Sequence, residues 1–213
     1  MTIFFDFNGT ILDDLDLTFE ILNKMLQEEG LPTVTKERYL DIFGFPIKDY
    51  YIKAGFDFNK KPFDVLAKRF IEEYQPRSMH LKLHDYLVES IMDLRQSGFK
   101  IICLSASEIN NLKEQLKNYK IEHLFDDILG TSDVHAKSKV DIAKNYVKLN
   151  NLDVNHIIMI GDTDHDLEVA KSIGAEAILY SKGHQNHNRW DHPYIIHSFK
   201  NLKKEILNIW EKR

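Results

Sequence analysis

The sequence predicts an α/β fold in which a parallel sheet is covered by helices on both faces and interrupted by an all-helical insert. Three observations predict it. Short apolar runs alternate with amphipathic helical patterns from about residue 84 onward, and this alternation is typical of parallel sheets. The runs are continuously apolar, as in strands that are buried on both faces. Residues 14–80 show helical patterns and no convincing strand.

Six apolar runs are the expected strands. Several of them end in polar or glycine-containing turns, which is where a buried strand opens into a loop. The runs are Ile3–Phe5, Lys100–Leu104, Ile128–Leu129, His156–Ile160, Ala177–Tyr180 and Tyr194–Ile196.

Apolar residues at helical spacing predict the helices. Ile109 to Tyr119 forms one, with Ser107 as its N-cap, and Ser138-Lys139-Val140-Asp141 resembles the capping box of a second. A third covers 167–173 and stops at Gly174. Within the insert we expect helices over 15–26, 39–43 and 63–74, the last ended by Pro76. The predicted organisation is therefore a core made of 1–13 and 81–213, and a helical domain at 14–80.

Composition excludes several classes of protein. The chain has 213 residues, 43% of them hydrophobic, which suits one core domain with a smaller insert. A net charge of −5 gives no general attraction to nucleic acid or anionic membranes. No run of about 18 apolar residues and no secretory signal is evident. The single cysteine, Cys103, cannot form an intrachain disulfide and is expected to be buried, so we expect a cytoplasmic protein.

Polar residues follow four of the expected elements. They are Asp6 with Asn8 and Thr10, then Ser105, then the segment with Lys137 and Lys139, and last Asp162 with Asp166. Ligands of doubly wound sheets bind beyond the carboxyl ends of the strands. The pattern therefore brings acids, a hydroxyl and a base to one edge of the sheet.

These residues resemble the motifs of the haloacid dehalogenase superfamily. Asp6-Phe7-Asn8-Gly9-Thr10 looks like its first motif, Ser105 its second, Lys139 its third, and Gly161 to Asp166 its fourth. The resemblance covers nearly the whole chain and implies a Rossmann-like core. The insert stands where the helical cap of the phosphoglycolate-phosphatase-like branch belongs.

The resemblance implies magnesium-dependent hydrolysis of a small phosphate monoester. Asp6 would attack phosphorus and form an aspartyl-phosphate. Mg²⁺ would be held by Asp6, the backbone carbonyl of Asn8 and Asp162, with Asp166 as a ligand or as support for the ligands.

The phosphate would be bound by hydroxyl, amide and ammonium groups. Thr10 and Ser105 would donate hydrogen bonds to phosphoryl oxygens, helped by turn N–H groups such as that of Ala106. Lys139 would neutralise charge from the start of a helix, and we prefer it to Lys137 because Lys-Val-Asp opens that helix.

Position 8 departs from the family. Its phosphatases carry a second aspartate there, which protonates the leaving oxygen and then activates water. Asn8 cannot exchange a proton near neutral pH, and such help is worth about 10²–10⁴-fold in rate. We therefore expect slow turnover, especially of alkyl phosphates, and an intermediate that accumulates.

Three alternatives stay open at this point. Another group, such as Asp13 or a cap residue, relays protons in a weak phosphatase. The chain is a phosphate-binding or regulatory protein that has lost catalysis. Asn8 serves a neighbouring chemistry of the same superfamily.

Two further features are weaker signals. Lys48, in the loop Gly44 to Lys48, is a candidate for reading an anionic group of the substrate. The late histidines have no standard zinc spacing, and we interpret them as a polar loop in which His184 lies near the rim of the site.

Overall fold

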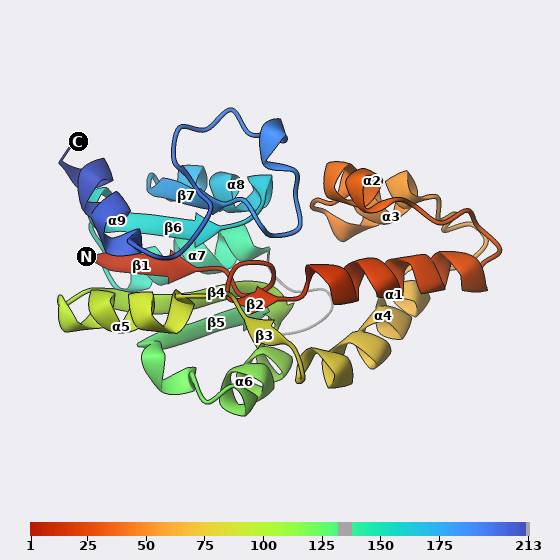
Figure 1. Cartoon of the computed structure of the whole chain (residues 1–213), viewed down its shortest axis with the longest axis horizontal. Helices are drawn as coiled ribbons and strands as arrows, with labels where there is room; N and C mark the ends of the chain where they lie inside the picture. Colours follow the sequence, from red (N-terminus) through yellow and green to blue (C-terminus); the bar gives the residue numbers. More distant parts are fainter. Residues whose placement is uncertain (132–137, 212–213) are drawn as a thin grey trace.

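The computed structural model describes residues 1–131 and 138–211. Its main sheet has six parallel strands in the described residues, in the order β5-β4-β1-β6-β7-β8. They are β1 (Thr2–Phe5), β4 (Lys100–Glu108), β5 (Asp127–Thr131), β6 (Ile157–Gly161), β7 (Glu176–Tyr180) and β8 (Ile195–Ile196). The predicted parallel sheet is confirmed, and β1 lies near its middle between β4 and β6 (Figure 1).

Helices cover both faces of this sheet. α5 (Leu87–Gln96), α6 (Ile109–Asn118) and α9 (Leu202–Trp210) pack against one face, in a cluster that includes Ile3 and Phe5 of β1. α7 (Lys139–Leu149) and α8 (Asp164–Ser172) pack against the other face, in a cluster that includes Phe4. Because successive residues of a strand point to opposite faces, a run as apolar as Ile3-Phe4-Phe5 can contribute to both clusters.

The insert consists of α1 (Leu15–Glu28), α2 (Lys36–Ile42), α3 (Ile47–Ala54) and α4 (Phe63–Ser78). These helices share a hydrophobic cluster of their own, which includes Ile21, Leu22, Tyr39 and Leu66. Figure 1 shows the insert extending from the end of the sheet at which β1 terminates. The helices are therefore held together by their own core and project over the carboxyl ends of the strands.

Two connections join the insert to the sheet. The antiparallel pair β2 (Leu12–Asp13) and β3 (Lys82–Leu83) flanks it at both ends. The loop between β7 and β8 contacts α2 and the segment after it: Gln185 Nε2 and Arg189 donate to the carbonyl of Phe43 at 2.9 and 3.0 Å. This loop passes beside α2 in Figure 1.

Several local predictions were wrong. α4 continues through Pro76 to Ser78, because a proline near the last turn removes only one hydrogen bond from the helix. Glu108, and not Ser107, caps α6, since its carboxylate accepts the N–H groups of Asn110 and Asn111. The strand before it runs to Glu108 with an irregularity after Leu104, so Ser105 lies inside β4. The capping box of Ser138 and Asp141 is confirmed.

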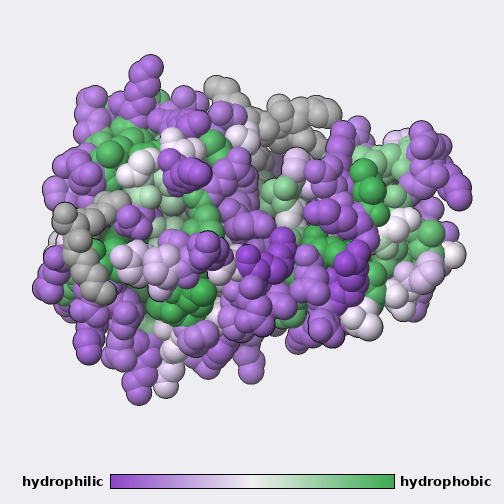
Figure 2. Space-filling view, turned by 90° about the horizontal axis from the view of Figure 1, so that it is seen from above, coloured by the Kyte–Doolittle hydropathy of each residue, from purple (hydrophilic) through white to green (hydrophobic). Residues whose placement is uncertain are grey.

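The face of the molecule shown in Figure 2 is mostly polar. Figure 2 shows polar side chains over most of one face, with apolar side chains in separate patches. Within 1–131 and 138–211, no helix combines the length and apolar character that crossing a bilayer needs. Cys103 is fully buried in β4, as expected.

Candidate active site

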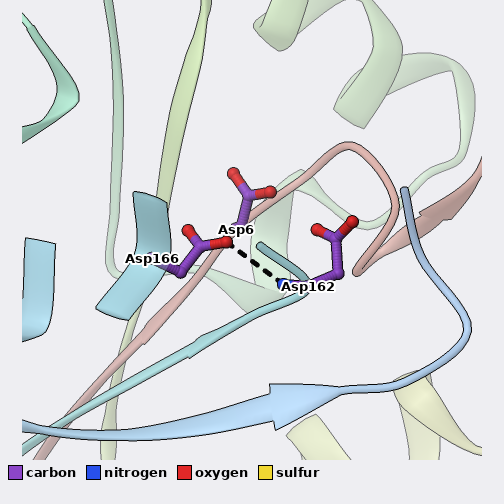
Figure 3. Close-up of side chains that lie close together, drawn as sticks. All are labelled: Asp6, Asp162 and Asp166. Atoms are coloured by element: carbon purple, nitrogen blue, oxygen red, sulfur yellow. Dashed lines mark hydrogen bonds between the residues drawn. The ribbon is translucent and has the colours of Figure 1, made fainter. Parts of the chain in front are cut away.

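Three aspartates converge at the carboxyl ends of β1 and β6. Asp6 follows β1, Asp162 follows β6, and Asp166 lies in the first turn of α8. All three are buried, and one carboxylate oxygen from each lies within 4.8 Å of the others. Figure 3 shows the three side chains together, with a hydrogen bond from the Asp162 N–H to Asp166. We call these residues the acidic cluster.

Lys139 is the cation of this cluster. Its Nζ lies 2.5 Å from Oδ1 of Asp6 and 2.6 Å from Oδ1 of Asp166, and the residue is buried. The capping box places Lys139 at the first helical position of α7, where the helix dipole adds positive charge. The competing Lys137 lies outside the described residues.

Burial and charge shift the pKa values of the cluster in different directions. Burial holds the pKa of Asp6 well above its usual range, although Lys139 opposes the shift. Burial raises the pKa of Asp162 to about 6. Burial also disfavours ionisation of Asp166. The charge of Lys139 and hydrogen bonds from Lys139 and Thr163 outweigh burial and lower the pKa of Asp166. Asp166 is therefore the acid of this cluster that its surroundings keep most firmly ionised.

Thr10 and Gly9 fix the position of Asp162. The Thr10 hydroxyl is fully buried and donates to Oδ1 of Asp162 at 2.9 Å, so it faces that carboxylate. Gly9 has φ +72°, and a Cβ there would lie 2.3 Å from Oδ2 of Asp162. Glycine at this position thus supplies both the left-handed backbone and the close approach of the loop.

The segment at the end of β4 faces Asn8. Ser105 is buried, and its Oγ accepts the N–H of Ser107 at 3.0 Å. The Ser107 hydroxyl donates to Oδ1 of Asn8 at 2.9 Å. The carbonyl of Ala106 accepts a long hydrogen bond of 3.4 Å from Thr131. The first and second motifs are therefore brought together through Asn8.

The insert contributes two tyrosines to the same region. The hydroxyl of Tyr74 lies 2.6 Å from Nδ2 of Asn8, and the hydroxyl of Tyr39 lies 2.7 Å from Nδ1 of His184. His184 is buried, and its backbone N–H donates to Asp162 at 2.7 Å. Lys48 is not among these residues: it is exposed, with its ammonium 5.1 Å from the centre of the Phe63 ring.

Sequence reasoning missed Asp14, Tyr74, Tyr39 and Ser107. Asp14 is buried beside Asn8, whereas its neighbour Asp13, the acid considered from the sequence, is exposed. Asp13 and Asp14 are adjacent aspartates before a helix, and the sequence does not indicate which of the two is buried. The tyrosines had the ordinary pattern of apolar positions in a helix.

The acidic cluster fits a magnesium ion. Carboxylate oxygens are the ligands that Mg²⁺ prefers, and three buried carboxylates converge here with one ammonium between them. Oδ2 of Asp166 already accepts hydrogen bonds from the N–H groups of Asp162 and Thr163 and from the Thr163 hydroxyl. Fewer hydrogen bonds are directed to Asp6 and Asp162, so their carboxylates are the more available to hold an ion.

Comparisons with known proteins identify the family of this chain. Residues 3–180 match the family model described as haloacid dehalogenase-like hydrolase. The chain is 26% identical to phosphoglycolate phosphatase of Caulobacter vibrioides, covering 98% of this chain and 91% of that protein. It is 22% identical to pyrophosphatase PpaX of Bacillus mycoides, covering 94% of each.

A solved structure shows the same fold. It is described as a predicted phosphatase from Clostridium acetobutylicum, and it aligns with a TM-score of 0.83 at 22% identity over 97% of this chain and 98% of that one. The family model covers most of the chain, and the motifs expected for the family converge at one end of the sheet. The chain belongs to the haloacid dehalogenase-like hydrolase family.

Proposed function

We propose that this protein is a magnesium-dependent phosphatase that hydrolyses a small phosphate monoester through an aspartyl-phosphate on Asp6. One observation carries the proposal. Asp6 ends β1 within a buried cluster that also holds two further carboxylates and the ammonium of Lys139. A carboxylate nucleophile can approach an anionic phosphate only where cations offset the repulsion. Lys139 supplies one positive charge, and the two further carboxylates would hold Mg²⁺, which would supply two more.

Each residue has a role that follows from its surroundings. The carboxylate of Asp6 attacks phosphorus, while Lys139 compensates negative charge on Asp6 and on the incoming phosphoryl group. Ser105 and the N–H of Ala106 bind phosphoryl oxygens. Asp6, the carbonyl of Asn8 and Asp162 would hold Mg²⁺, with support from Asp166. When bound, the ion stabilises the charge that develops on the phosphoryl oxygens.

Thr10 has a different role from the one expected from the sequence. We expected its hydroxyl to bind a phosphoryl oxygen. The hydrogen bond of 2.9 Å to Asp162 supports a role in orienting that carboxylate, since groups behind a metal ligand fix its direction.

Asn8 makes the reaction slow. The amide cannot protonate a leaving oxygen or activate water, and the loss is worth about 10²–10⁴-fold. Phosphates with good leaving groups therefore react faster in the first step than alkyl phosphates. The alternative function is a phosphate-binding or regulatory protein that uses the same site without turnover.

The insert at 14–80 is the cap of this site. Tyr39 and Tyr74 bring it into contact with Asn8 and His184, and Asp6, Lys139 and Ser105 are all buried. We propose that the insert moves as a unit to admit substrate and closes to exclude water. The position of Lys48 over Phe63 gives no support to a role for Lys48 in substrate recognition.

The substrate is a small phosphorylated metabolite, and the protein acts in the cytoplasm. Relatives named for phosphoglycolate and for pyrophosphate make these two compounds the first to test. The experiment is hydrolysis of p-nitrophenyl phosphate, phosphoglycolate and pyrophosphate, with Mg²⁺ or with EDTA. The proposal expects Mg²⁺-dependent release of phosphate that Asp6→Asn abolishes. Magnesium-dependent phosphate binding without hydrolysis above the Asp6→Asn control selects the alternative.

A further inference from the structure

Asp14 is a buried carboxylate with four hydrogen-bond donors. Its Oδ1 accepts the N–H of Gly9 at 2.7 Å and faces Nε2 of His184 at 3.0 Å. Its Oδ2 accepts Nδ2 of Asn8 at 2.9 Å and the hydroxyl of Tyr74 at 2.5 Å. Only 1% of Asp14 is exposed. One side chain therefore joins the loop after Asp6, the β7–β8 loop and the insert.

These contacts fix the direction of the Asn8 amide. A tyrosine hydroxyl has one hydrogen, and that of Tyr74 is directed to Asp14, so its oxygen accepts from Nδ2 of Asn8. On the other side of the amide, Oδ1 of Asn8 accepts the hydroxyl of Ser107 at 2.9 Å. A rotated amide would turn its oxygen toward the carboxylate of Asp14. Only the orientation with nitrogen toward Asp14 satisfies every partner.

A carboxylate at position 8 does not fit these surroundings. It would present an oxygen to Oδ2 of Asp14 at about the present 2.9 Å, so two acceptors of like charge would face each other. An acid at that position, as in the phosphatases of this family, would have to share a proton with Asp14, because two carboxyl groups this close do not both ionise. An exchange of both residues keeps the match, because an amide at position 14 can donate to a carboxylate at position 8.

We propose that Asn8 and Asp14 are a matched pair, in which the carboxylate at position 14 requires an amide at position 8. Asp14 is a positioning residue: it orients Asn8 directly and holds the loop after Asp6 through the N–H of Gly9. The pairing itself does not depend on catalysis. Its effect on turnover rests on the proposed phosphatase function.

A double-mutant cycle tests the pairing without any substrate. Melting temperatures are measured in EDTA for the full chain with Asn8→Asp, Asp14→Asn and both together. Asp16→Asn, an exposed aspartate in α1 that pairs with Lys36, is the control. Each single substitution lowers the melting temperature by at least about 4 °C. The double variant melts at least about 4 °C above the value expected from adding the two losses. Additive losses overturn the proposal.

The kcat for p-nitrophenyl phosphate with Mg²⁺ is a second measurement, which would not change in this way if Asp14 had a purely structural role. Measured well below the melting temperatures, kcat of Asn8→Asp does not exceed that of the natural sequence, and the double variant exceeds Asn8→Asp by about tenfold or more. A kcat for Asn8→Asp above those of both the natural sequence and the double variant contradicts the proposal. If no variant exceeds Asp6→Asn, the phosphatase function fails, and the melting temperatures alone decide the pairing.

Discussion

The ammonium of Lys139 bridges two carboxylates, lying 2.5 Å from Asp6 and 2.6 Å from Asp166. The surrounding charges of Asp166 and Asp6 overcome burial and raise the pKa of Lys139, so the residue stays cationic. This ammonium offsets the charge of Asp6 and Asp166, and the charge of His184 acts in the same way on Asp162. Lys139 therefore contributes to stability, in addition to its proposed role in phosphate binding.

Removal of Lys139 is expected to be costly. Lys139→Met leaves buried carboxylates without their partner, and breaking a buried ion pair in this way costs about 3–5 kcal/mol. Urea denaturation in EDTA measures the loss. Lys144→Met, at an exposed position of the same helix, is the control and should change stability little. Equal stabilities for the two variants would show that the bridge is unimportant.

Alanine substitutions at Gly9 and Gly30 distinguish the effect of backbone strain from the effect of a contact with the site. Both have positive φ, +72° and +67°, but a Cβ at Gly9 meets Asp162 whereas one at Gly30 has open space around it. We expect both alanine substitutions to destabilise by about 1 kcal/mol through strain. Only Gly9→Ala should also abolish Mg²⁺-dependent hydrolysis, because it displaces Asp162. Loss of activity in both, or in neither, argues against that clash.

Thr10→Val tests whether Thr10 orients Asp162. The substitution keeps the shape but removes the hydrogen bond of 2.9 Å, leaving Oδ1 of Asp162 with one partner fewer. The Mg²⁺ concentration for half-maximal activity should rise about tenfold or more, because groups behind a metal ligand typically contribute that much to affinity. Thr18→Val, at a buried threonine of α1, should leave this concentration unchanged. If KM for the phosphate ester rises instead, Thr10 binds phosphate.

The stability of the insert should depend on acid pH through Glu73. Its carboxylate contacts Lys24, Arg69 and Arg77 at 2.7–3.0 Å. Partial burial opposes ionisation, but the hydrogen bonds from Lys24 and Arg69 lower the pKa of Glu73 from 4.5 to about 2. A carboxyl group whose pKa is lower in the folded state than in the unfolded state stabilises the fold at pH values above its unfolded pKa. That contribution is lost as the pH falls toward its folded pKa.

Glu73→Gln should therefore lower stability by about 1 kcal/mol at neutral pH, the size expected for partly screened pairs. The difference from the natural sequence should shrink as pH falls from about 4.5 toward 2. Thermal melts across this range measure it. Glu72→Gln, at an exposed neighbour 3.8 Å from Lys68, should show little effect at any pH. A constant difference across the range would exclude the ion pairs as its cause.

The sheet and the acidic cluster were predictable because their signals are local. A run such as Ile3-Phe4-Phe5 identifies a strand buried on both faces, and a polar residue after it marks the carboxyl edge of the sheet. Asp6, Asp162 and Asp166 met at that edge once the strands were parallel. Two-residue strands such as β2 and β3 were missed, because their pairing depends on a contact between distant segments.

The network around Asn8 was not predictable from the sequence. Its partners Asp14 and Tyr74 are separated by 60 residues and meet only when α4 packs beside the start of α1. Asp13 and Asp14 are the same residue type at adjacent positions, and only the fold determines that Asp14 is buried and Asp13 is exposed. Likewise, nothing in the loop before Lys48 indicated that its ammonium would lie over Phe63.

The most direct test of the central claim is whether phosphate becomes attached to Asp6. The protein is mixed with labelled acetyl phosphate and Mg²⁺, quenched in acid and digested, and the labelled peptide is identified by mass spectrometry. Because Asn8 cannot activate water, the intermediate should persist long enough to be trapped. The account predicts Mg²⁺-dependent label on the peptide that contains Asp6 and none in Asp6→Asn. Label on another residue, or hydrolysis that persists in Asp6→Asn, would contradict it.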